Sequence, residues 1–136
     1  MYILIISIEK SIIVRVGRLG YLSFDNGIYA YVGSAQNNLK MRVARHFRKK
    51  KRIFWHIDHL LSSEHAKILE VFFKVAPKAE ECRTAETLRE TGEAIRGFGS
   101  SDCRCVSHLL KVSNYERLKW LIENMNFMKV ELEKLV

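Results

Sequence analysis

The residues best suited to chemistry lie in one short stretch, where Tyr-Val-Gly-Ser-Ala is followed by a basic segment with helical periodicity. Tyr29, Tyr31 and Gly33 alternate along the chain and point to one face of a strand, while Arg42 and His46 are one helical turn apart. A phenol, a guanidinium and an imidazole can therefore meet beside one strand end. The same pattern also fits a half-buried sheet tyrosine next to a solvated basic helix.

Positive charge continues beyond this stretch and dominates the whole chain. Lys and Arg number 23 against 15 Asp and Glu, which gives a formal charge of +8. Such a surplus favours polyanionic partners through counterion release, so we expect DNA as the partner, with RNA not excluded. The residues expected to contact nucleic acid are Arg45, His46, Arg48, Lys49, Lys50, Lys51 and Arg52.

Several motifs in a fixed order together resemble the GIY-YIG endonuclease superfamily. Its second signature is a Tyr-Ile/Val-Gly strand, then Ser-Ala, an Arg on the next helix and a nearby His, which Tyr31 to His46 match. The later motifs Trp-His-Ile-Asp-His-Leu-Leu, Glu-Cys and Phe-Gly-Ser-Ser-Asp-Cys-Arg-Cys-Val-Ser-His-Leu look like one branch of that superfamily. The resemblance is strongest over residues 1–110.

This resemblance implies a metal-dependent endonuclease that hydrolyses phosphodiester bonds in DNA with Mg²⁺ or Mn²⁺. Tyr2 and Tyr31 would supply the general base and its assistant, Arg42 would stabilise the developing charge, and His56 would lie on the phosphate side or shuttle a proton. Glu81 is the candidate metal ligand, because Mg²⁺ typically takes only one or two carboxylates and keeps several waters. Glu80 is its adjacent rival.

The letters Gly27-Ile28-Tyr29 spell the family name but do not fit its geometry. The two family tyrosines lie on separate strands, whereas Tyr29 is two residues from Tyr31 on the same strand. Tyr2 is therefore the expected counterpart, although Met1 stands where the family has glycine. The span between Tyr2 and Tyr31 is long enough for an extra hairpin.

Two other clusters offer competing interpretations. His56 and Asp58 can instead form a structural hydrogen bond, with His59 one turn from His56. A zinc site would need the ligands Cys82, Cys103, Cys105 and His108. The CxC pair has one intervening residue where zinc modules usually have two to four, and the fourth ligand is distant in sequence, so we expect no zinc.

The elements that must position these residues give an α+β fold, with a small antiparallel sheet flanked by helices in a single domain over residues 1–136. Short β-branched and aromatic runs predict an antiparallel meander joined by hairpins, with strands at 2–6, 12–16, 21–24 and 28–32. Helical periodicity begins at Asn38. Further elements are expected at 54–61 (helix), 68–75 (strand), 78–91 (helix) and 114–136 (one or two amphipathic helices).

The cysteine count and the apolar runs suggest a location. An odd number of cysteines without a secretory signal favours a reducing, cytoplasmic environment. The apolar opening Met1 to Ile6 is far shorter than the ~20 residues needed to cross a bilayer, so we expect no membrane segment. A protein partner that supplies specificity, a non-catalytic nucleic-acid-binding module and a zinc-stabilised interaction domain stay open as alternatives.

Overall fold

The computed structural model describes residues 1–35, 37–100 and 103–135. Its helices are α1 (Leu39–His46), α2 (His56–Leu61), α3 (Glu80–Leu88) and α4 (Tyr115–Asn124), with 3₁₀ turns at Gly17–Leu19, Arg89–Thr91 and Leu132–Lys134. Its strands are β1 (Tyr2–Ile8), β2 (Ile12–Arg15), β3 (Tyr21–Phe24), β4 (Gly27–Gly33), β5 (Ala66–Phe73), β6 (Gly92–Ala94), β7 (Leu109–Val112) and β8 (Met128–Val130).

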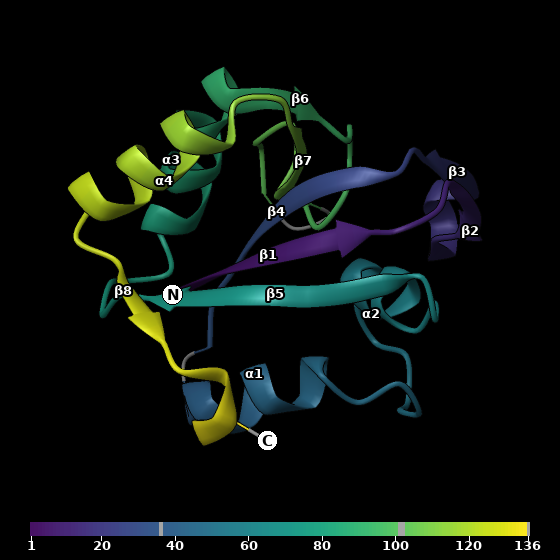
Figure 1. Ribbon diagram of the computed structural model, residues 1–136, viewed down its shortest axis with the longest axis horizontal. Coiled ribbons are helices and arrows are strands. Elements are labelled where there is room, and N and C mark those ends of the chain that lie inside the picture. The colour runs from purple at the N-terminus through teal and green to yellow at the C-terminus, as the bar shows by residue number, and fades with distance from the viewer. Residues whose placement is uncertain (36, 101–102, 136) are drawn as a thin grey trace.

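The strands form a six-stranded antiparallel sheet in the order β6-β7-β4-β1-β5-β8, with β2 and β3 paired in a separate hairpin. The predicted meander is therefore wrong, because β1 pairs with β4 and β5 and not with β2 (Figure 1). Strand β1 is buried along nearly its whole length and needs a neighbour on each edge, whereas β2 alternates between partly buried and exposed residues. The extra hairpin expected between Tyr2 and Tyr31 is present.

Helices cover both faces of the sheet, as expected for the α+β class. Tyr2, Leu4 and Ile6 pack on one face against α1 and α2, and Ile3 and Ile5 pack on the other against α3 and α4 (Figure 1). This alternation follows from the period-two geometry of a strand buried on both sides. Among the described residues, none of the helices combines the length and apolar character needed to span a bilayer.

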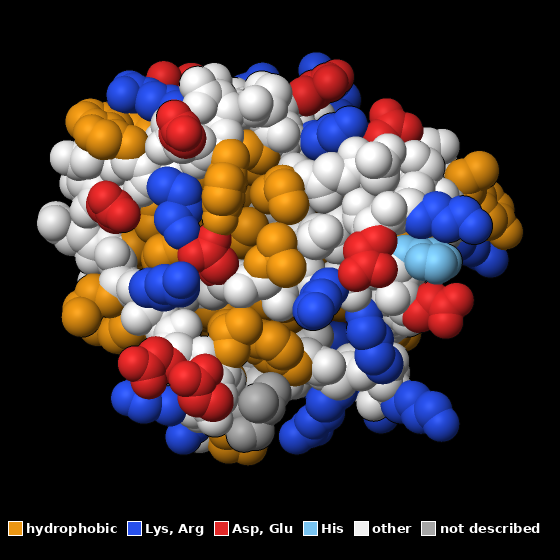
Figure 2. Space-filling view, viewed as in Figure 1, with side chains coloured by type: hydrophobic (Ala, Val, Ile, Leu, Met, Phe, Trp, Pro, Cys, Tyr) orange, Lys and Arg blue, Asp and Glu red, His pale blue; other side chains and the backbone are white. Residues whose placement is uncertain are grey.

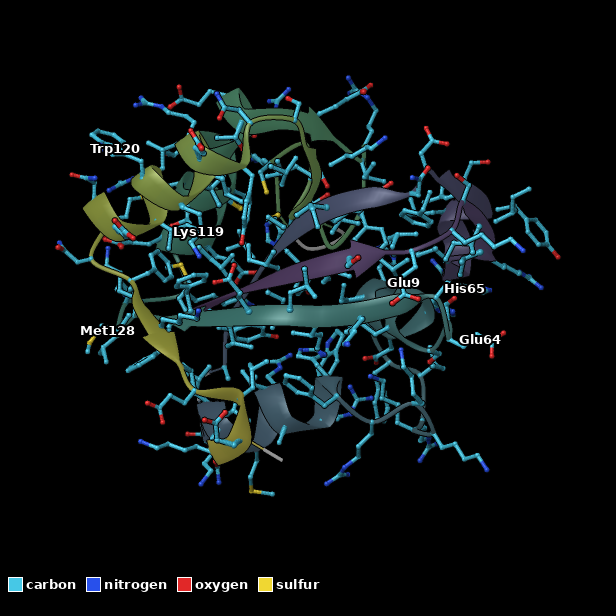
Figure 3. All side chains as sticks on the ribbon, viewed as in Figure 1. Glu9, Glu64, His65, Lys119, Trp120 and Met128 are labelled. Carbon is cyan, nitrogen blue, oxygen red and sulfur yellow. The ribbon has the colours of Figure 1, made fainter. Side chains whose placement is uncertain are left out.

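The C-terminal tail, where one or two amphipathic helices were expected, forms one helix and then a strand. Helix α4 forms as predicted, but Asn126 then adopts a left-handed conformation and the chain continues as strand β8 on the edge of β5. Glu70 of β5 fixes this arrangement, because Lys119 of α4 and Lys129 of β8 lie 2.5 and 3.2 Å from its carboxylate (Figure 3 labels Lys119). Covering an open sheet edge outweighed local helical periodicity.

Candidate active site

A polar pocket of about 160 Å³ lies where β1, β4, α1 and α3 converge. It contains two phenols, a guanidinium, an imidazole and a carboxylate. Its lining residues are Tyr2, Tyr31, Gly33, Ser34, Arg42, His46, Trp55, Lys78, Glu81 and Gly99.

The pairing of β1 with β4 brings the two predicted tyrosines together. Tyr2 lies opposite Gly33, and Leu4 opposite Tyr31, so the phenols are diagonal neighbours on one face with ring centroids 6.5 Å apart. A Cβ atom at Gly33 would lie 2.5 Å from Cζ of Tyr2. The glycine of the Tyr-Val-Gly motif therefore makes room for the Tyr2 ring, which is a steric reason for its presence.

Tyr2 and His46 form a buried polar pair. The Tyr2 hydroxyl lies 2.7 Å from Nε2 of His46, a residue that is only 2% exposed. Burial, followed by the charge of Lys51, lowers the pKa of His46 to about 3, so the imidazole is neutral. Burial raises the pKa of Tyr2 and of Tyr31 above the usual phenol value. The Tyr2 hydroxyl and Nε2 of His46 thus form a hydrogen bond between two neutral groups.

Arg42 is held flat at the edge of the pocket. Its Nη1 donates to the carbonyl of Ser34 at 2.5 Å, and its guanidinium carbon lies 4.1 Å from the ring centre of Trp55. Among the described residues, its buried Nε and the buried Nδ1 of His46 have no hydrogen-bond partner. The positive charge of the Arg42 guanidinium, which lines the pocket, favours the binding of an anionic oxygen there.

Glu81, and not Glu80, faces the pocket. Its Oε2 accepts a hydrogen bond from Ser34 Oγ at 2.6 Å, and its Oε1 lies 2.8 Å from Nδ1 of His108. Burial raises the pKa of Glu81, but the contacts with His108 and Ser34 outweigh it, and the net shift is downward. The carboxylate is thus ionised. Glu80 instead lies 3.8 Å from Lys74 and does not line the pocket.

His56, a predicted site residue, does not line this pocket. Its Nδ1 accepts the backbone N–H of Gly99 at 2.9 Å, and its ring packs edge-on against Phe98. The alternative hydrogen bond from His56 to Asp58 is absent among the described contacts, because the Asp58 carboxylate binds Arg45 and two backbone N–H groups. His46 occupies the pocket instead, and its four-residue spacing from Arg42 was the available signal.

Comparison with known protein families assigns the chain to one family. Residues 1–130 match the sequence model of a family described as "Domain of unknown function DUF123". The chain belongs to this family. No curated protein and no solved structure matches this chain. The description of DUF123 states no activity, so the chemistry of the pocket carries the functional assignment.

The basic segment of this DUF123 chain is less available than its composition suggests. His46 is buried, Lys51 has a side chain only 3% exposed, and Arg45 binds the buried carboxylate of Asp58 at 2.8 Å. Nζ of Lys49 donates to the carbonyls of Leu61, Ser63 and Ala66. Burial therefore argues against His46 and Lys51 as contacts to nucleic acid, whereas Lys49 is exposed despite its hydrogen bonds and the role of the other residues stays a prediction. Arg48, Lys50 and Arg52 are exposed.

On the face shown in Figure 2, Lys and Arg side chains are interspersed with acidic and hydrophobic ones. Positive charge is spread over this surface instead of concentrated on it. The net charge of the chain therefore does not by itself locate a binding surface.

The expectation of no zinc rested in part on the distance of Cys82 along the sequence, and the structure removes this objection. Cys82 of α3 packs against the loop between β6 and β7, so that Cys82, Cys103, Cys105 and His108 gather their ligand atoms within 4.8 Å of one another. The chain thus has a Cys₃His cluster that can bind a metal. The sequence does not reveal this cluster, because Cys82 is distant along the chain and reaches the other three ligands only through the packing of α3. Residues 101–102 of the neighbouring motif lie outside the described ranges.

Proposed function

We propose that this protein is a metal-dependent endonuclease that hydrolyses phosphodiester bonds in DNA, as its resemblance to the GIY-YIG nucleases implies. The observation that carries the proposal is the convergence of two tyrosines, Arg42, His46 and Glu81 on one pocket of about 160 Å³. Phosphoryl chemistry requires groups that bind a phosphate, move a proton and hold a cation. This pocket contains side chains suited to each task.

The donors in the pocket fit a hard divalent cation. Glu81 is ionised and Ser34 adds a hydroxyl oxygen 2.6 Å from it, a set of oxygen donors that suits Mg²⁺ or Mn²⁺. Glu81 would hold the cation while water fills the remaining positions. A bound cation would lower the pKa of a coordinated water and neutralise developing negative charge.

The other side chains bind the phosphate and handle protons. Arg42 lines the pocket and would offer its guanidinium charge to a phosphate oxygen. With the His46 hydrogen on Nδ1, the Tyr2 hydroxyl proton would pass to Nε2 of His46 as the phenol oxygen takes a proton from the attacking water. Tyr31, which is buried beside Tyr2 and lines the pocket, would orient the attacking water. Free thiols at all three cysteines suit a reducing compartment such as the cytoplasm.

The test is a cleavage screen on labelled duplex, branched and single-stranded DNA and on RNA, with Mg²⁺ or Mn²⁺. Tyr31→Phe should reduce cleavage by at least ~100-fold, the usual scale for loss of a group that handles a proton. Tyr29→Phe is the matched control, because its hydroxyl donates to the carbonyl of Asp25 at 2.8 Å and not into the pocket. Tyr29→Phe should cleave at close to the wild-type rate.

Other outcomes decide against the proposal. Equal losses in both tyrosine variants would mean that the family signature is assigned to the wrong residue. Wild-type protein that binds DNA yet cuts no substrate with any cation would support the non-catalytic binding module instead. Cleavage that requires an added protein would identify a partner that supplies specificity.

A further inference from the structure

The Cys₃His cluster has the dimensions of a tetrahedral metal site. Sγ of Cys103 lies 3.2 Å from Sγ of Cys105, and Nε2 of His108 lies 2.9 to 3.5 Å from the three sulfurs. Ligands of tetrahedral zinc, with bonds of about 2.3 Å to sulfur and about 2.0 Å to nitrogen, stand roughly 3.5 to 3.8 Å apart. Four ligand atoms within 4.8 Å therefore surround a space of the right size for one ion.

The chemistry of the ligands selects zinc over the hard cation assigned to the pocket. Three thiols and one imidazole are soft or borderline donors, which in tetrahedral geometry favour zinc. All three cysteines are free thiols, and they come from two separate parts of the fold, α3 and the loop before β7. Thiols form only weak hydrogen bonds, so hydrogen bonding to one buried imidazole is a poor reason for three to converge.

We propose that Cys82, Cys103, Cys105 and His108 bind one zinc ion, and that His108 uses its other nitrogen to position Glu81. Coordination through Nε2 places the ring proton on Nδ1, and this atom lies 2.8 Å from Oε1 of Glu81. Zinc would thus fix the tautomer of His108 and, through it, the carboxylate. The zinc site stands independently of nuclease activity, whereas the role of Glu81 rests on the proposed function.

The same site also fixes a wall of the pocket. Gly99, in the cysteine-bearing loop, has a φ of +70°, and a Cβ atom there would lie 3.3 Å from Tyr31 and 3.2 Å from His108. Its backbone N–H binds His56. A loop tied to α3 through zinc therefore keeps Gly99 beside Tyr31. Buried Phe98 and the backbone hydrogen bonds from Gly97 to Val106 and from His108 to Phe98 order this loop internally, and zinc would add the link to α3.

The zinc site is tested on full-length protein purified without a metal-affinity tag from zinc-supplemented culture. Elemental analysis should find about one zinc per chain, and chelation should lower the melting temperature by about 5 °C or more. Cys105→Ser and His108→Gln should each lower zinc content at least fivefold. His65→Gln is the matched control, because His65 lies far from the cluster, near Glu9 and Glu64 (Figure 3).

Cobalt(II) added to the metal-free protein should give intense thiolate charge-transfer absorption that Cys105→Ser lacks. Wild-type protein that stays nearly free of zinc after reconstitution, or that shows no such absorption, would overturn the site. A disulfide between Cys103 and Cys105 in freshly purified protein, with no bound metal, would overturn it as well.

The positioning role of His108 is tested with His108→Cys, which keeps four zinc ligands but removes Nδ1. This variant should keep about one zinc, while the Mg²⁺ concentration for half-maximal cleavage rises at least ~10-fold, as expected for loss of an outer-shell partner. If His108→Cys loses zinc, the test uses wild-type protein from which zinc has been removed, assayed below its melting temperature. The Mg²⁺ concentration for half-maximal cleavage should rise in the same way. Unchanged Mg²⁺ dependence in the protein tested would overturn the coupling. Wild-type protein that contains a full equivalent of zinc but cleaves no substrate would count against the nuclease proposal and not against the zinc site.

Discussion

The pocket and the basic segment use their polar groups in opposite ways. In the pocket, Nε of Arg42 and Nδ1 of His46 are buried without a partner among the described residues. In the basic segment, Arg45, Lys49 and Lys51 donate to Asp58 or to backbone carbonyls. A basic side chain whose donors are already paired with Asp58 or with backbone carbonyls stabilises the fold and is poorly placed to bind a phosphate. The partners of each charge, and not its presence in the sequence, distinguish a binding site from a structural network.

The largest expected effect concerns the structural side of this comparison. Asp58→Ala should lower the free energy of unfolding by about 3–5 kcal/mol, because it leaves Arg45 and two backbone N–H groups without their buried acceptor. Asp25→Ala, at an exposed carboxylate 3.8 Å from Lys111, is the control and should cost less than about 1 kcal/mol. Urea unfolding measures both. A small loss of unfolding free energy for Asp58→Ala would mean that the contacts between Asp58 and the basic segment contribute little to stability.

On the pocket side, Gly33→Ala should reduce cleavage by about 100-fold, because its Cβ would displace the ring of Tyr2 from its place beside His46. Gly20→Ala is a useful contrast. It lies in a turn with a φ of +76°, where an added Cβ meets nothing within 4 Å, so it should cost some stability but no activity. Equal cleavage by both variants would show that the Tyr2 ring need not occupy its present position.

Spacing along the chain predicted that Tyr31 and Arg42 can meet, because a short strand and the helix after it keep their side chains on known faces. Glu81 was predicted from the resemblance. Tyr2 was predicted from the resemblance, and the pairing of β1 with β4 brings it to the pocket. Cys82 was rejected as a ligand, since only the packing of α3 beside the loop before β7 brings it to Cys103. The side chain of Lys51 is buried and therefore not available to a ligand. Hydropathy cannot predict the burial of one lysine among other basic residues.

A smaller effect concerns the exposed cations that remain. If Arg48, Lys50 and Arg52 each contact one phosphate, DNA affinity should fall by about 40-fold between 50 and 200 mM salt. Replacing all three by alanine should nearly abolish this salt dependence, whereas Lys49→Met should change stability more than binding. Fluorescence anisotropy at several salt concentrations measures both. A flat response in the wild-type protein would contradict a nucleic-acid role for this segment.

A further effect, absent near neutral pH, is a pH dependence from His46. The unfolded chain binds a proton near the usual pKa of 6.5, whereas the buried imidazole, with a pKa of about 3, stays neutral. Stability should therefore fall as pH drops below about 6.5, by up to about 1.4 kcal/mol per pH unit until the folded pKa is reached. His46→Gln should lack this component. Parallel stability curves for the two proteins between pH 6.5 and pH 4 would show that His46 is not buried neutral.

The most direct test of the nuclease proposal compares two adjacent glutamates. Glu81 is asked to hold a cation whose effect is greatest in the transition state, so Glu81→Ala should reduce cleavage in Mg²⁺ by at least ~100-fold. DNA affinity should hold or rise, because a negative charge leaves the pocket. Glu80→Ala, which removes a carboxylate outside the pocket, should cleave like wild type. Normal cleavage by Glu81→Ala in Mg²⁺ would contradict the assignment of this pocket as the active site.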